Sequence, residues 1–251
     1  MCHADATSRI RHDEQVHAEE RSPKVVPVDV WLRRVADVGP APELLDEHER
    51  RVLAGLVTHA AARSYAAGHV LLRRAVSEAV GVSPTALRFD RTCSVCGAQH
   101  GRPVLLDDPA LHLSLSHASE AIAVAVSHTA PVGVDIETHA AVDFEAFAES
   151  ALHEEELERV EDGPAGGLAG GLEGRLARRA TAWVRKEATL KALGVGLRLD
   201  ATRFPAPPTG ARVCVADLGE VVVVDLPVPW PGLSAALAVS GPFDVIEVRA
   251  R

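Results

Sequence analysis

The chain has 251 residues, of which 47% are hydrophobic and 24% charged, and this balance is that of a globular protein rather than a disordered or fibrous one. Its formal net charge of -9 argues against a general nucleic-acid binder, which needs a basic face to neutralise phosphates. The length allows one large domain or two small ones around a sizeable core.

The sequence contains no segment that predicts a membrane partner. No apolar run approaches the length of about 18 residues that a membrane span needs, and residues 1–24 lack the apolar centre of a signal peptide. We expect residues 1–24 to form a disordered leader and the cytoplasm to be the protein's compartment. The cysteines are too few and too scattered for a disulfide framework, which fits a reducing environment: Cys2, Cys93, Cys96 and Cys214.

Residues 25–130 are predicted to form an α+β unit. The long helix in this segment is amphipathic and closes at Gly81. Residues 111–116 alternate leucine with polar side chains, and they turn into an apolar run that a further strand follows. The elements expected in this half, and the strand after it, are a strand over 25–30, a helix over 42–53, a helix over 60–80, a strand over 87–89, and a meander of strands over 111–116, 121–126 and 132–137.

Residues 131–251 repeat this pattern weakly. A helix over 180–193 runs into a glycine-containing segment as the earlier long helix does, and residues 235–248 are similar to residues 123–137 in pattern. The other elements expected here are a helix over 143–160, a mobile glycine-rich loop over 163–174, and strands over 212–216 and 220–226. The repeat predicts a pseudo-dimer of two similar halves, 25–130 and 131–251, each a long helix on a small antiparallel sheet, with one active site between them. We therefore expect a monomer.

Two stretches carry the candidate chemistry. In residues 131–137 the apolar side chains alternate with polar ones, so Asp135 and Glu137 share one face of a strand and are close enough to bind one divalent ion. In residues 183–191 a helical period stacks Trp183, Glu187 and Lys191 on one stripe. In isolation the first pair is typical of a solvated strand face, and Glu187 with Lys191 is typical of a simple helix ion pair.

Other charged and metal-binding residue types leave alternatives open. Cys93, Cys96 and His100 form half of a zinc knuckle, but no second pair in the sequence completes the four ligands of a closed site. The sequence therefore favours a turn with two reduced thiols, with zinc as the alternative. A basic cluster around the second long helix either meets an acidic partner or forms a solvated face: Arg175, Arg178, Arg179, Arg185 and Lys186.

Four motifs in order resemble those of the Sfp-type 4'-phosphopantetheinyl transferases. They are Val-Gly-Val-Asp-Ile-Glu at 132–137, Trp-Val-Arg-Lys-Glu-Ala-Thr-Leu-Lys at 183–191, His-Gly-Arg-Pro at 100–103 and Leu-Ser-Leu-Ser-His at 113–117. The second motif resembles the actinobacterial-like subgroup that carries a Trp and Lys-Glu-Ala. The resemblance spans roughly residues 25–250, and four ordered motifs are far more specific than one. The family's duplicated α+β fold agrees with the repeat.

The resemblance implies a reaction and a set of site residues. The phosphopantetheine arm of coenzyme A would pass to a serine of an apo acyl or peptidyl carrier protein of a polyketide, peptide or fatty-acid synthase, with release of 3',5'-ADP. Mg2+, or Mn2+ in its place, would be held by Asp135, Glu137 and Glu187. Glu187, Lys191 and His117 would be catalytic, and the residues that bind coenzyme A would be Arg63, Arg102, Ser116, His117 and Lys191.

The chain departs from the family pattern at three places. Arg102 stands where many members have lysine, His69 where relatives often have arginine, and Leu113-Ser114 where an aromatic-Asn pair is usual. Two other functions remain open. A Mg2+-dependent phosphohydrolase would cleave the pyrophosphate with the same acids and need no carrier protein. A non-catalytic carrier-binding module would bind the carrier without binding Mg2+ and coenzyme A together.

Overall fold

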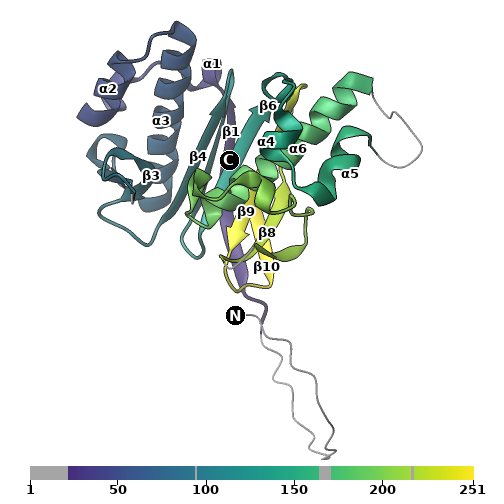
Figure 1. Cartoon of the computed structure of the whole chain (residues 1–251). Helices are drawn as coiled ribbons and strands as arrows, with labels where there is room; N and C mark the ends of the chain where they lie inside the picture. The colour runs from purple at the N-terminus through teal and green to yellow at the C-terminus, as the bar shows by residue number, and fades with distance from the viewer. Residues whose placement is uncertain (1–21, 94, 164–170, 216–217) are drawn as a thin grey trace, which may run out of the picture.

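The computed structural model describes residues 22–93, 95–163, 171–215 and 218–251. It confirms the α+β class: two four-stranded sheets lie between two 22-residue helices, and a separate two-stranded sheet lies beside them (Figure 1). Most of the predicted leader lies outside the described residues. None of the helices in the described part of the chain has the length and apolar character needed to cross a bilayer.

The first sheet has the strand order β10-β1-β5-β4. Its strands are β1 (Val25–Arg34), β4 (His112–Ala118), β5 (Ala121–Ser127) and β10 (Val245–Ala250). Helix α3 (His59–Val80) covers its outer face, with Thr58 as N-cap and Gly81 in the left-handed conformation at the C-terminus. A core that includes Leu72, Leu113 and Ile122 fills the space between helix and sheet. The predicted long helix is therefore confirmed.

The second sheet has the order β6-β9-β8-β7. Its strands are β6 (Val132–Thr138), β7 (Arg212–Val215), β8 (Gly219–Asp225) and β9 (Leu233–Ser240). Helix α6 (Gly171–Ala192) covers its outer face, and the apolar faces of the two sheets pack against each other at the centre. The order of a strand, a long helix and two antiparallel strands thus occurs in both halves. The duplication itself stays a prediction.

The predicted meander is wrong at its third strand. β4 and β5 pair as expected, but β6 pairs with β9, about a hundred residues later. β4 and β6 instead lie edge to edge across the boundary between the sheets. Serine side chains of β4 bridge the two edges: Val134 N donates to Ser114 Oγ at 2.9 Å. The last strand also crosses over, because β10 pairs in parallel with β1 in the first sheet. Both crossings tie the two halves together.

Several expected boundaries change in the first half. The helix over 42–53 is a 3-10 turn, η1 (Pro42–Leu44), followed by α2 (Glu47–Ala54), because Asp46 and Glu49 form a capping box that starts the helix there. A strand was predicted over 87–89, and the observed strand begins at Phe89, the last residue of that range. The remaining elements in this half are α1 (Val35–Val38), η2 (Pro84–Ala86), β2 (Phe89–Thr92) and β3 (Gln99–Leu105).

The helix expected over 143–160 is interrupted at Leu152, which is extended. Lys186 is fully buried, donates to Ala151 O at 2.7 Å and pairs with Glu156, so it binds the chain where the helix breaks. α6 begins at Gly171 rather than at residue 180, and residues 164–170 of the expected mobile loop lie outside the described part. The short elements here are η3 (His139–Val142), α4 (Phe147–Ala151), η4 (Glu154–Glu156), α5 (Leu157–Glu161), η5 (Gly196–Arg198) and η6 (Ala201–Arg203).

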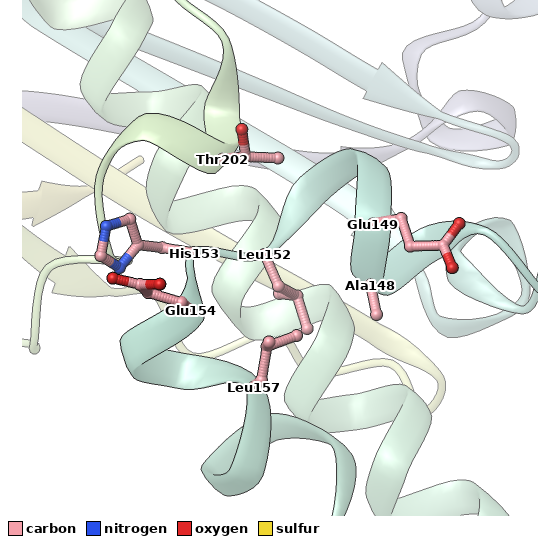
Figure 2. A pocket seen from close by; sticks show the side chains of 7 residues that line it. All are labelled: Ala148, Glu149, Leu152, His153, Glu154, Leu157 and Thr202. Atoms are coloured by element: carbon pink, nitrogen blue, oxygen red, sulfur yellow. The ribbon is translucent and has the colours of Figure 1, made fainter.

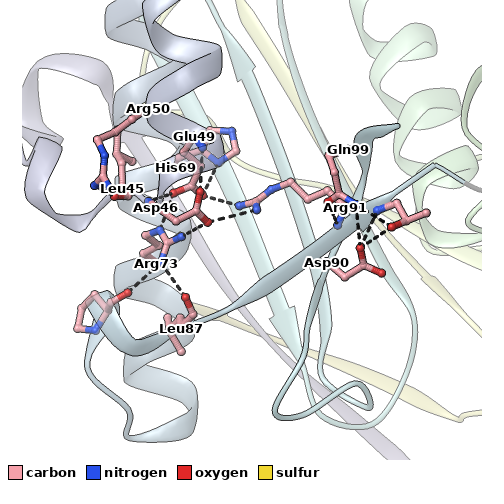
Figure 3. A network of polar contacts seen from close by, with 12 residues as sticks. Leu45, Asp46, Glu49, Arg50, His69, Arg73, Leu87, Asp90, Arg91 and Gln99 are labelled. Atoms are coloured by element: carbon pink, nitrogen blue, oxygen red, sulfur yellow. Dashed lines mark hydrogen bonds and ion pairs between the residues drawn. The ribbon is translucent and has the colours of Figure 1, made fainter. Parts of the chain in front are cut away.

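A buried polar network fastens α2 to α3 and β2 (Figure 3). Glu49 is fully buried; it accepts from Arg73 Nε at 2.7 Å, contacts His69 Nδ1 at 3.1 Å and pairs with Arg91. Burial alone would raise the pKa of Glu49, but the hydrogen bonds from His69 and Arg73 outweigh it and lower this pKa to about 2. The network therefore needs Glu49 ionised, and it holds His69 on the helix that faces the candidate site.

Candidate active site

A close approach of strand β6 to helix α6 sets the geometry of the site. Gly133 on β6 lies directly under the helix: a Cβ atom there would come within 2.0 Å of Ala188 O and 2.5 Å of Ala192 N. Only glycine permits this contact. Because the two elements touch, side chains of α6 and of β6 two residues beyond Gly133 reach one another.

Asp135 and Lys191 form the centre of the site. Asp135 is buried, and its Oδ1 accepts from Lys191 Nζ at 2.6 Å and from Ser116 Oγ at 2.7 Å. Lys191 Nζ also donates to Val134 O at 3.2 Å. Ser116 Oγ accepts from Ile136 N at 3.4 Å. A strand from each sheet and the second long helix therefore meet at one carboxylate oxygen.

Glu137 and Glu187 add two partly buried carboxylates. Glu137 Oε1 accepts from Thr138 N at 2.7 Å. Oε1 of Glu187 is buried and finds no hydrogen-bond partner among the described residues. Burial raises the pKa of Glu187, and the charges of Asp135 and Glu137 raise it further, while Lys191 opposes them. The pKa of Glu137 is likewise raised, first by burial and then by Asp135. Glu137 and Glu187 are thus destabilised as anions by burial and by neighbouring carboxylates, and the charge of Lys191 offsets this only in part.

These residues fit a hard divalent ion. Carboxylate oxygens are the preferred protein ligands of Mg2+ and Mn2+, and an unpartnered buried oxygen on Glu187 costs free energy that a cation would recover. In this structure the ligand oxygens of Asp135, Glu137 and Glu187 are not all within 4.8 Å of one another. Among the described residues, the one set of three His, Cys, Asp or Glu ligand atoms that meets this limit is Cys93, Cys96 and His100. Lys191 is the cation that Asp135 binds instead.

His117 follows Ser116 on β4 and faces α3 at Gly68, where an added Cβ would lie 3.7 Å from the His117 ring. The residue is exposed at its edge, yet desolvation lowers the pKa of His117, and the charges of His69 and Lys191 lower it further. An imidazole with a lowered pKa is neutral near pH 7 and offers one donor and one acceptor. His69 stacks on Tyr65, with ring centroids 4.2 Å apart.

The two predicted arginines lie at the rim. Arg63, in the first turns of α3, is exposed and pairs with Glu120 at 3.5 Å. Arg102 on β3 donates from Nε to Leu113 O at 3.2 Å, and burial lowers the pKa of its guanidinium. Both therefore border β4, the strand of Ser116 and His117, from different elements.

Two surface pockets have well-defined linings. One, of about 190 Å3, lies between the halves and beside the site, because it is lined by Glu120 from the β4–β5 turn and by Thr138, which follows Glu137. The other, of about 330 Å3, lies over α4 and α5 and is lined by Leu152, His153, Leu157 and Thr202 among others (Figure 2). None of the predicted site residues lines either pocket.

Both interpretations of the basic cluster are wrong for most of its members. Arg179 Nε and Nη2 each donate to Glu161 at 2.7 Å, Arg185 binds Asp225, and Lys186 is buried against Glu156. Arg178 donates to Val160 O at 2.9 Å. These cations fasten α6 to its neighbours. Trp183 is partly buried and packs edge-on against Phe147, beside a hydrophobic core cluster.

Two residues of the site were missed from the sequence. Gly133 carries a signal that sequence reasoning can use, because an isolated glycine inside a strand often marks a close backbone approach. Ser114, which accepts from Val134 N, carries no such signal. Its role depends on where the edges of two sheets meet, which local sequence does not encode.

Comparison with known proteins supports the resemblance. The sequence profile of the 4'-phosphopantetheinyl transferase superfamily matches residues 131–221, from β6 to β8. The 4'-phosphopantetheinyl transferase psf-1 of Bacillus pumilus is 30% identical to the chain over 145 residues. That alignment spans 58% of this chain and 56% of the relative, so the chain matches little more than half the length of that protein. The ordered motifs, the α+β fold and these two matches make the chain similar to the 4'-phosphopantetheinyl transferase superfamily, with the profile match confined to residues 131–221.

Proposed function

We propose that the protein transfers the 4'-phosphopantetheine arm of coenzyme A to a serine hydroxyl of an apo acyl or peptidyl carrier protein. The observation that carries the proposal is the orphaned, buried carboxylate oxygen of Glu187, held beside Asp135 and Glu137 and next to Lys191. A superfamily profile matches the same segment. This set of charges suits a substrate that brings phosphate and a divalent ion together.

Asp135, Glu137 and Glu187 would hold Mg2+, or Mn2+ in its place. When bound, the ion neutralises charge on the pyrophosphate and orients the phosphorus that is attacked. In the reaction the carrier serine oxygen forms a bond to the phosphorus of the pantetheine phosphate, and the bond from that phosphorus to the oxygen of 3',5'-ADP breaks. The serine proton goes to the carboxylate of Glu187, whose pKa is raised by burial and by its acidic neighbours.

The cations and the imidazole around the acids would bind coenzyme A. Lys191 Nζ, now on Asp135 Oδ1, would turn to the leaving phosphate and balance its charge. Neutral His117 and the hydroxyl of Ser116 would donate to phosphate oxygens, and Arg63 and Arg102 would add charge-assisted hydrogen bonds at the rim. One chain supplies every residue of this set, and we propose that the protein acts as a monomer in the cytoplasm.

The test is transfer itself. The protein is incubated with coenzyme A, Mg2+ and a panel of apo carrier proteins from polyketide, peptide and fatty-acid synthases, and the products are weighed. We expect at least one carrier to gain a phosphopantetheinyl group, with an equal amount of 3',5'-ADP. Release of phosphopantetheine without any carrier would instead identify a phosphohydrolase. Carrier binding without consumption of coenzyme A would identify a binding module, and both results contradict the proposal.

A further inference from the structure

The turn between β2 and β3 brings together three residues with metal-binding side chains. The sulfur atoms of Cys93 and Cys96 and a ring nitrogen of His100 all lie within 4.8 Å of one another. Cys96 Sγ is 3.0 Å from His100 Nε2. These residues lie on the hairpin, outside the acidic set that the transfer reaction would use.

The backbone of the turn is shaped to hold both sulfurs. Gly97 has a positive φ of 74°, which lets the chain reverse direction after Cys96. Gly97 N donates to Cys93 O at 2.9 Å, and Cys93 N donates to Ala98 O at 2.8 Å. These backbone hydrogen bonds fix the turn that carries Cys93 and Cys96.

We propose that Cys93, Cys96 and His100 bind a zinc ion that cross-links the β2–β3 turn. Zn–S and Zn–N bonds of about 2.3 and 2.0 Å in a tetrahedral site separate the ligand atoms by about 3.6–3.8 Å. The separation of 3.0 Å between Cys96 Sγ and His100 Nε2 and the upper limit of 4.8 Å for all three pairs lie on either side of that range. Two thiolates and an imidazole form a soft donor set that selects Zn2+ over Mg2+. Two thiolates also balance the charge of the ion.

The fourth position of this zinc is open to solvent. No further His, Cys, Asp or Glu of the described residues joins the set, and Cys96 and His100 are exposed. The role follows from the fold: β2 and β3 form a two-stranded sheet by themselves, and such a hairpin is only marginally stable. Zinc at the turn would hold β3, and with it Arg102, against β4.

The first experiment measures metal in the purified, reduced, full-length protein. Mg2+ is kept in excess so that the acids are occupied, and zinc is counted by mass spectrometry of the elements. We expect one zinc per chain in the wild type and in Cys214→Ser, the matched control on β7. We expect loss of this zinc in Cys93→Ser/Cys96→Ser. An equal zinc content in the wild type and the double variant would overturn the proposal.

A second measurement probes the ligand set spectroscopically. Co2+ is added to the metal-free, reduced wild-type protein in place of zinc. Thiolate-to-cobalt charge-transfer absorption, together with intense visible bands typical of tetrahedral cobalt, is the expected result, and it should weaken in His100→Ala. Amide exchange in the peptide over residues 89–105 should slow when the metal binds. Absence of the charge-transfer band at saturating Co2+, or a Cys93–Cys96 disulfide in the protein as purified under reducing conditions, would overturn the proposal.

Discussion

Lys191 Nζ of helix α6 lies 2.6 Å from Asp135 Oδ1 of strand β6. The ammonium occupies the carboxylate oxygen that the proposed function assigns to a divalent ion. If the ion binds there as proposed, its binding and the release of Lys191 are coupled, and the released ammonium would be available for a phosphate of coenzyme A. The pair joins helix α6 to strand β6.

Replacing Lys191 tests this competition. In Lys191→Met we expect Mn2+ to bind about tenfold more tightly without coenzyme A, because a positive charge next to the ion is removed. Phosphopantetheine transfer should nevertheless fall, because the leaving phosphate loses its cation. Mn2+ affinity is measured by titration with paramagnetic resonance detection. Equal or weaker Mn2+ binding in Lys191→Met would contradict the competition.

Glu187→Gln separates stability from activity. Because the pKa of Glu187 is raised by burial and by Asp135, its ionised form destabilises the folded state at neutral pH in the absence of metal. We expect the amide to raise the melting temperature of the metal-free protein and to lower transfer by about 100- to 10,000-fold, as loss of a proton acceptor does. Mg2+ should stabilise the wild type more than the variant. A variant with near-normal transfer would refute the role of Glu187.

The buried network of Glu49 predicts an acid-sensitive step. The pKa of Glu49 is lowered from 4.5 to about 2, so its contribution to stability is present above pH 4.5 and is lost as the pH falls toward 2. This loss amounts to about 3 kcal/mol at 1.36 kcal/mol for each unit. The free energy of unfolding of wild type should therefore converge on that of Glu49→Gln between pH 5 and about 2.

Denaturant titrations at several pH values provide the measurement. Glu47→Gln, on the same helix but largely exposed, is the control, and we expect its curve to remain parallel to the wild type. A constant difference between wild type and Glu49→Gln over this pH range would show that the carboxylate is not held ionised by its partners.

Gly133→Ala tests the close approach of β6 to α6. A Cβ atom 2.0 Å from Ala188 O forces the helix away from the strand, which we expect to cost about 3 kcal/mol or more. Lys191 would then no longer reach Asp135, and transfer should fall more than stability alone explains. Gly55→Ala, whose Cβ would meet its nearest atom at 3.4 Å, should be close to wild type in both. Normal transfer by folded Gly133→Ala would contradict the assignment.

The local periodicity of the sequence predicted the helices and strands better than it predicted which strands pair with which. Alternation over residues 132–137 and the helical period over 60–80 with Gly81 after it identified β6 and α3. The partner of β6 is β9, a pairing that depends on the whole second half. The helix break at Leu152 follows from buried Lys186, whose binding to Ala151 O no short-range pattern reveals.

The same distinction applies to the site. The periods of the two motifs grouped Asp135 with Glu137 and Glu187 with Lys191, and the family resemblance assigned both pairs to a site. The structure brings Asp135 and Lys191 into contact. Neither period indicates that Ser116 donates to Asp135, because that bond joins the edges of separate sheets. The other lysine of the same helix, Lys186, stands only five residues before Lys191 in the sequence but lies fully buried, away from solvent.

A crystal structure with coenzyme A and Mn2+ tests the central claim most directly, because anomalous scattering locates manganese. The account predicts a manganese peak bound by oxygens of Asp135, Glu137 and Glu187 and by the pyrophosphate, with Lys191 moved from Asp135 to a phosphate oxygen. Manganese bound elsewhere, or Glu187 turned away from a pyrophosphate that reaches no acid of β6, would contradict it.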